Sequence, residues 1–194
     1  MDKSLIFKNF KMNINMKKYF NLVIVVAFVV TLASCNKEEY KAPVSSVVSM
    51  SGRWWTELYF DDAQDGIPVP DGLIYAYADF GGYGLTTTNT AANDDDSVLI
   101  DDLHGSWPFR IKAPVSLGSL SFTPSTVLNI QEDYLGSGET VKIIDGKILK
   151  GAARSKSGAV ADSIFIEFEF SDDPGSYYIY TGHRDSGQSE DRYE

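Results

Sequence analysis

His104 and His183 are the two histidines of this 194-residue chain and its candidates for a general base at neutral pH. His104 lies in the segment DDLHGSW, close to Asp102 and Ser106, which are the residue types of a nucleophile, base and acid triad. Neighbouring residues of a strand point to opposite faces, so this proximity in sequence does not require the side chains to converge. We interpret the segment as a polar turn before a Trp-Pro strand start, and keep a hydrolytic site on His104 or His183 as the alternative.

Other catalytic signatures are missing from the sequence. The nucleophile elbow G-x-S-x-G of α/β hydrolases does not occur. Two histidines and a single cysteine give no zinc spacing, and the acidic run 93–96 lacks the calcium-loop pattern. We therefore expect neither a metal nor a cofactor, and interpret 93–96 as an acidic hairpin tip. Glu167 and Glu169 share one face of a predicted strand, which is typical of a solvated outer face rather than of a glycosidase pair.

Aromatic side chains are the better functional lead, because they make up 13% of the chain. A closed barrel of eight strands is just wide enough to be filled by side chains or to hold one small ligand. Aromatics on its strands would give such a lumen apolar walls with polar tips, although many of them must serve only as core. The candidates to line a ligand site are Tyr75, Tyr77, Trp107, Phe109, Tyr178 and Tyr180.

The first 34 residues have the organisation of a secretory signal peptide. Five lysines and a single acid precede or flank an uncharged run over residues 20–34. That run has 15 residues, fewer than the roughly 20 that a membrane-spanning helix needs. An uncleaved anchor helix is the alternative. Translation starting at Met12 or Met16 instead of Met1 would give a more typical basic region.

Leu32-Ala33-Ser34-Cys35 ends the apolar run and resembles the lipobox of bacterial lipoproteins. The resemblance implies cleavage before Cys35 and acylation of this residue, which would anchor the protein to the outer membrane. The following triplet Lys37-Glu38-Glu39 is either an acidic signal for export to the cell surface or a solvated linker. We predict three parts: a signal peptide over 1–34, the lipidated cysteine with a tether over 35–50, and a barrel domain over 51–194.

Charge excludes nucleic acid as a partner. The chain has a formal net charge of −10. Removal of residues 1–34 leaves 12 of the 17 basic and 26 of the 27 acidic residues, a net charge near −14. Such a surface repels phosphate backbones and anionic lipid headgroups.

Strand alternation, and no convincing helical period, follows residue 50. Turn-rich segments separate the runs, so we predict a sandwich or a closed barrel of about eight to ten strands. Within 141–152, Asp145-Gly146 is a strong hairpin signal, and 117–138 reads as a long loop or as a strand plus a loop. In the run 162–170 the alternate residues Ile164, Ile166, Phe168 and Phe170 form an apolar face. The predicted strands are 52–60, 73–80, 85–90, 97–103, 107–115, 141–152, 162–170 and 177–181.

Gly52-Arg53-Trp54 opens the first predicted strand and resembles the G-x-W signature of lipocalin-like (calycin) barrels. In those barrels the tryptophan plugs the closed end, and an arginine at the end of the last strand packs over it. The resemblance assigns barrel closure to Gly52, Trp54 and Arg184. The alternative is that Trp54 is an ordinary core aromatic and Arg184 a surface charge.

A wider resemblance covers most of residues 50–191. The lipobox, the early G-x-W, and the segments at 89–93, 101–103, 107–109 and 182–187 are similar to a family of bacterial lipoproteins described as lipid-binding putative hydrolases. The family implies an all-β, lipocalin-like antiparallel barrel. It also implies a second basic residue after Arg184, where this chain has Asp185, which weakens any anion contact there.

We therefore predict a cell-envelope lipoprotein whose barrel binds a lipid or another small apolar ligand. The alternatives are an envelope hydrolase and an accessory surface lipoprotein that binds glycan or a partner protein of the envelope through rim aromatics.

Overall fold

The computed structural model describes residues 19, 44–61, 72–75 and 84–193. The chain divides into two compact units, Met1–Pro43 and Val44–Glu194, and every core residue of the described part lies in the second. That unit therefore carries a complete core of its own. The lipobox with Cys35, the side chain of Tyr75, and Tyr77 lie outside the described residues. No helix formed by the described residues is both long and apolar enough to cross a membrane.

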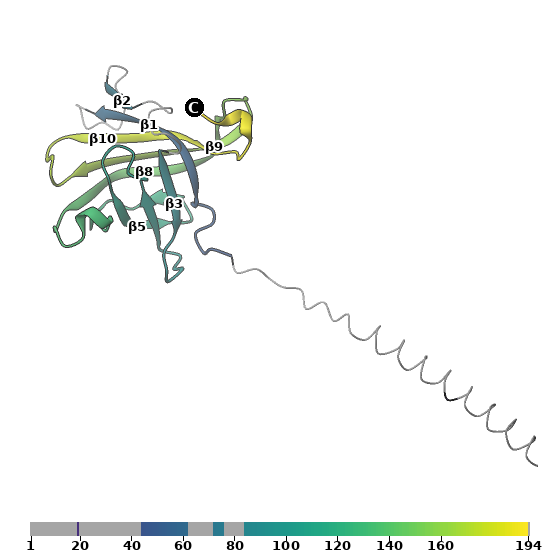
Figure 1. Cartoon of the computed structure of the whole chain (residues 1–194), viewed down its shortest axis with the longest axis horizontal. Helices are drawn as coiled ribbons and strands as arrows, with labels where there is room; N and C mark the ends of the chain where they lie inside the picture. The colour runs from purple at the N-terminus through teal and green to yellow at the C-terminus, as the bar shows by residue number, and fades with distance from the viewer. Residues whose placement is uncertain (1–18, 20–43, 62–71, 76–83, 194) are drawn as a thin grey trace, which may run out of the picture. The chain divides into compact units, whose positions relative to one another are not determined.

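An antiparallel barrel of eight strands makes up the second unit, which confirms the all-β prediction. The ring runs β1, β3, β4, β5, β6, β8, β9, β10, and β10 pairs back onto β1 (Figure 1). Outside the ring, β2 pairs with β1 and β7 pairs with β8. The strands are β1 Gly52–Asp61, β2 Leu73–Tyr75, β3 Leu85–Asn89, β4 Ser97–Asp101, β5 Arg110–Ser116, β6 Ser121–Phe122, β7 Ser125–Leu128, β8 Thr140–Arg154, β9 Val160–Phe170 and β10 Tyr177–Arg184.

Side chains fill the interior of this barrel. The predicted apolar face of β9, from Ile164 to Phe170, lies in the core as expected, beside Tyr178 and Tyr180 of β10. Val47 and Met50, which precede β1, are also fully buried in the core, so the chain already packs on the barrel before its first strand begins. Because the largest buried side chains form one cluster, a ligand has to bind at an exposed edge of that cluster rather than at its centre.

The prediction of a hairpin at Asp145-Gly146 is wrong. Both residues lie inside β8, where the pairing with β9 shifts by one residue between Ile143 and Asp145. The two flanking runs pair with β9 and not with each other, and the residue skipped in the pairing is Ile144, which forms a bulge, while Gly146 pairs with Ile166. A Cβ at Gly146 would lie 3.0 Å from the ring of Phe122, which explains the small residue in this strand.

The solvated outer face predicted for β9 is wrong at Glu167. Glu169 pairs with Lys142 at 2.6 Å, and that hydrogen bond holds the pKa of Glu169 below its usual range. Glu167 is only 2% exposed, however, and its partner in β10, Ile179, is fully buried. Another part of the chain therefore covers the outside of the barrel here, which alternation within one strand cannot show.

The segment 117–138 contains more structure than a loop. It forms β6, β7 and the 3-10 turn η3 Glu132–Tyr134. Of these elements, β6 links β5 to β8 in the ring, and β7 pairs with β8 outside it.

Candidate functional site

The structure brings together the three residues that the calycin resemblance assigns to barrel closure. The guanidinium carbon of Arg184 lies 5.0 Å from the centre of the Trp54 ring, and Arg184 donates a hydrogen bond to the carbonyl of Ser51 at 2.7 Å. A Cβ at Gly52 would lie 3.1 Å from Nε of Arg184, so the glycine leaves room for the arginine. Trp54 donates from Nε1 to Thr87 at 2.9 Å. We name this end of the barrel the Arg184 end.

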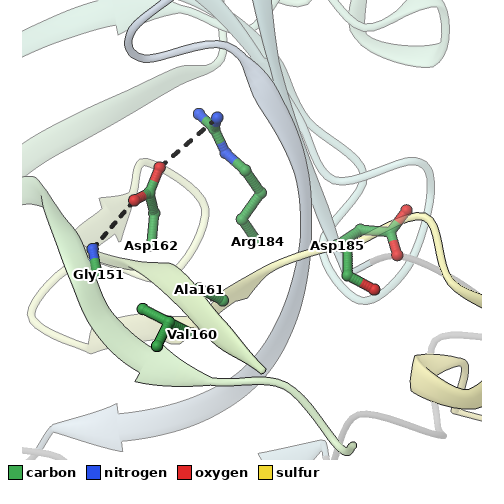
Figure 2. A pocket seen from close by; sticks show the side chains of 7 residues that line it. Gly151, Val160, Ala161, Asp162, Arg184 and Asp185 are labelled. Carbon is green, nitrogen blue, oxygen red and sulfur yellow. Dashed lines mark hydrogen bonds and ion pairs between the residues drawn. The ribbon is translucent and has the colours of Figure 1, made fainter. Parts of the chain in front are cut away.

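A cavity of about 210 Å³ borders Arg184 on its outer side (Figure 2). There the guanidinium lies 3.6 Å from Asp162, which also accepts hydrogen bonds from Lys150 and from the N–H of Gly151. Burial opposes ionisation of Asp162, but these partners outweigh it and lower the pKa of the carboxyl. Because charged side chains line this cavity, it is poorly suited to an apolar ligand.

Asp185 occupies the position at which the family resemblance implies a basic residue. Its carboxylate accepts hydrogen bonds from Nε1 of Trp55 at 3.2 Å and from the N–H of Gly187 at 3.1 Å, and it lies 3.9 Å from Arg53. An acceptor at this position fixes the start of the C-terminal tail. A basic side chain could not accept these bonds.

Four of the six predicted ligand-lining aromatics meet in one cluster at the other end. Trp107 lies 5.2 Å from Tyr178, and Phe109 lies 5.9 Å from Tyr180, measured between ring centres. Phe168 and Phe170 of β9 complete the cluster. Since Tyr178 lies near the start of β10 and Arg184 ends it, the cluster lies at the opposite end of the barrel, which we name the Trp107 end.

Burial divides this cluster into a core and an edge. Phe109 and Tyr180 are fully buried and belong to the core. Trp107 is half-buried: its ring stacks on Phe170 at 5.2 Å with an interplanar angle of 11°, and its Nε1 donates to Asp172. Phe60, which is not among the predicted ligand-lining aromatics, is also half-buried, and its ring centre lies 5.9 Å from that of Tyr178. The edge that a ligand could reach therefore consists of Trp107 and Phe60.

Tyr178 remains a neutral hydrogen-bond donor beside this edge. Burial, and its hydrogen bond to Asp173, raise the pKa of the hydroxyl to about 12. The edge thus has apolar ring faces and acidic acceptors around them.

Asp102 positions the loop that carries Trp107. The carboxylate is fully buried and accepts backbone hydrogen bonds from His104, Ser106 and Phe109, at 3.1, 3.3 and 3.1 Å. Burial raises its pKa to about 6, although the three N–H groups act in the opposite direction. Asp102 therefore acts as a structural acceptor for this loop.

The candidate triad residues do not meet in a triad. Asp102 contacts the backbone N–H of His104, while the His104 ring contacts Gln131 and lies 3.5 Å from Asp133. The hydroxyl of Ser106 bonds to that of Tyr180 instead. His183, the other candidate base, is 3% exposed and its ring bonds to Tyr193 and to the carbonyl of Arg184, at the opposite end of the barrel.

Comparison with known proteins identifies the family. No curated protein matches the chain. A family model described as "lipid-binding putative hydrolase" matches residues 39–189, which include the whole barrel. The match covers well over half of the chain and agrees with the closed antiparallel barrel. The chain therefore belongs to the family of lipid-binding putative hydrolases.

Proposed function

We propose that this protein is a cell-envelope lipoprotein whose barrel binds a lipid at the Trp107 end. One observation carries the proposal: the aromatic cluster runs without interruption from the fully buried core to a half-exposed edge at Trp107 and Phe60. The lipid-binding description of the family supports the same class of ligand.

Because side chains fill the interior of the barrel, the lipid has to bind at the surface of the aromatic cluster. An acyl chain lies against the ring faces of Trp107 and Phe60 and does not need an empty lumen. Covering roughly 100 Å² of apolar surface contributes only about 2.5 kcal/mol. Binding that survives purification therefore requires Trp107 to turn, so that more of the acyl chain is buried. Among the described residues, the polar contact that restrains this ring is the hydrogen bond from Trp107 to exposed Asp172.

Replacing Trp107 with alanine tests the site. We expect residues 36–194, which contain the complete compact unit, to bind monomeric lysophosphatidylcholine, and we expect Trp107→Ala to weaken binding by about tenfold or more because the largest apolar contact is lost. Isothermal titration calorimetry below the micellar concentration measures both constants. Trp55→Phe, which changes a tryptophan packed against Tyr193 near the C-terminal tail, is the matched control. Equal affinity in Trp107→Ala and the control would remove the proposed site.

The membrane anchor belongs to the same proposal. The lipobox supports acylation of Cys35, and an outer-membrane location follows from it, with the surface of the cell as one possible face. Metabolic labelling with an alkyne fatty acid is expected to mark the wild-type protein and to leave Cys35→Ser unlabelled. Label retained on Cys35→Ser would contradict this anchor.

Hydrolysis is not proposed. Among the described residues, the side chains of His104, Ser106 and Asp102 do not form the chain of hydrogen bonds that a triad requires. The His104 ring contacts Gln131, the Ser106 hydroxyl bonds to Tyr180, and the Asp102 carboxylate accepts from backbone N–H groups.

A further inference from the structure

Exposed apolar side chains stand on two loops at the Trp107 end. Leu103 is 45% exposed, Ile130 40% and Leu135 66%. Leu103 belongs to the connection 102–109 between β4 and β5, and the other two belong to the connection 129–139 between β7 and β8. We call these two connections the rim loops.

Side-chain contacts join the rim loops into one unit. Gln131 contacts the ring of His104, and Nε2 of His104 lies 3.5 Å from Asp133. Asn129 accepts from the backbone N–H groups of Arg110 and Gln131, each at 3.0 Å. The exposed apolar residues therefore belong to two loops that are held together by side-chain contacts.

Leu103 is held in a conformation that its side chain disfavours. Its φ is 57° and that of His104 is 59°, in the left-handed region that bulky residues rarely adopt. The carboxylate of Asp101 accepts from the N–H of Leu103 at 2.8 Å, and that of Asp102 accepts from the N–H of His104. Two aspartates thus stabilise a strained turn that leaves a leucine exposed to solvent.

The acidic residues near the rim loops limit which kind of membrane surface these loops can contact. The exposed acids Glu132, Asp133 and Asp172 surround the apolar residues, and the nearby cation Arg110 is paired with Asp101 at 2.6 Å. Anionic headgroups are repelled, whereas the ammonium of a zwitterionic headgroup can approach these acids. Trp107, with a stacked ring and a hydrogen-bonded N–H, has the amphipathic character that places tryptophan at membrane interfaces.

We propose that the rim loops dock on a bilayer with neutral, zwitterionic headgroups such as phosphatidylethanolamine. The inference rests on the proposed function, because it names the surface from which the lipid reaches Trp107. Leu103, Ile130 and Leu135 enter the interface, and the acids around them remain at headgroup level.

Vesicle binding tests the docking. Residues 36–194 are sedimented with sucrose-loaded vesicles, made either of phosphatidylcholine with phosphatidylethanolamine or with about one third of the lipid replaced by phosphatidylglycerol. We expect binding to the neutral vesicles, several-fold weaker binding to the anionic ones at low salt, and recovery at about 0.5 M salt. The variant Leu103→Ser/Ile130→Ser/Leu135→Ser is expected to lose binding by about tenfold or more. The matched control is Leu149→Ser/Val160→Ser, which changes exposed apolar residues of the β8 and β9 strands.

A second variant separates docking from folding. Leu103→Gly is expected to raise the melting temperature, because glycine adopts the left-handed region freely, and also to weaken vesicle binding. A variant that is more stable but binds less cannot owe its defect to misfolding. Leu103→Gly that binds vesicles as the wild type does would overturn the role of this leucine.

Three results would overturn the docking proposal: no binding of the wild type to neutral vesicles, equal loss in the control pair, or a rim-dependent dimer in sedimentation velocity. None of them affects binding of monomeric lysophosphatidylcholine at Trp107. If lysophosphatidylcholine still binds while vesicle docking fails, only the docking proposal is contradicted. If lysophosphatidylcholine does not bind either, the proposed function is contradicted as well.

Discussion

Gly182→Ala is expected to prevent the barrel from closing. Gly182 lies opposite Thr56 in the pairing of β10 with β1, which is the seam that completes the ring. A Cβ at this position would lie 1.9 Å from the carbonyl oxygen of Trp55 and 2.8 Å from Cα of Thr56. Both are backbone atoms, so relief requires the two strands to separate. We expect a loss of at least about 3 kcal/mol in the free energy of unfolding.

Urea unfolding of residues 36–194, followed by circular dichroism, measures this loss. Gly118→Ala is the matched control, because an added Cβ there meets nothing within 4 Å. The control is expected to stay within about 0.5 kcal/mol of the wild type. A Gly182→Ala midpoint equal to that of the wild type would show that the seam between β1 and β10 is not formed as described.

Asp102 is expected to make the protein less stable as the pH rises from about 4 to 7. Burial raises its pKa to about 6 in the folded protein, against an ordinary value of 3.8. Between these values the folded state binds more protons than the unfolded state, so deprotonation favours unfolding. The difference corresponds to at most about 3 kcal/mol, fully present near pH 4 and lost as the pH passes the folded pKa.

The comparison with Asp102→Asn isolates this group. Its amide cannot ionise, so the free energy of unfolding of the wild type minus that of the variant should fall by up to about 3 kcal/mol between pH 4 and pH 7.5. Other acids contribute equally to both proteins and cancel. Asp95→Asn, at an exposed position of the acidic turn, is the control for the loss of one negative charge. A flat difference for Asp102→Asn would mean that the three backbone N–H groups hold the carboxylate ionised.

Local patterns predicted the parts of the fold that depend on neighbouring residues. The alternation of Ile164, Ile166, Phe168 and Phe170 identified the inner face of β9, because strand geometry alone decides it. Asp145-Gly146 gave a wrong prediction of a hairpin because the glycine is required by packing against Phe122, a contact between segments distant in sequence that the dipeptide cannot reveal. The prediction that Glu167 is solvent-exposed was wrong for a related reason. Its burial depends on another segment of the chain that packs over the outside of the sheet.

The contacts of the site could be predicted only where the residues lie at paired positions of neighbouring strands. Trp54 and Arg184 occupy paired positions of the first and last strands of the ring, so the order of the strands brings them together. The contact of His104 with Gln131, and the capture of three N–H groups by Asp102, depend on loop conformation. No periodicity in the sequence encodes these contacts. The sequence therefore predicted the aromatic cluster more fully than the rim loops beside it.

Native mass spectrometry of residues 36–194, purified from a bacterial host, tests lipid binding at the Trp107 end most directly. We predict a protein peak that carries one added lipid mass, that loses this mass after organic delipidation, and that regains it from a lipid extract. Trp107→Ala should carry markedly less of the adduct than Trp55→Phe. A wild-type protein that stays ligand-free, both as purified and after exposure to the extract, would contradict the account.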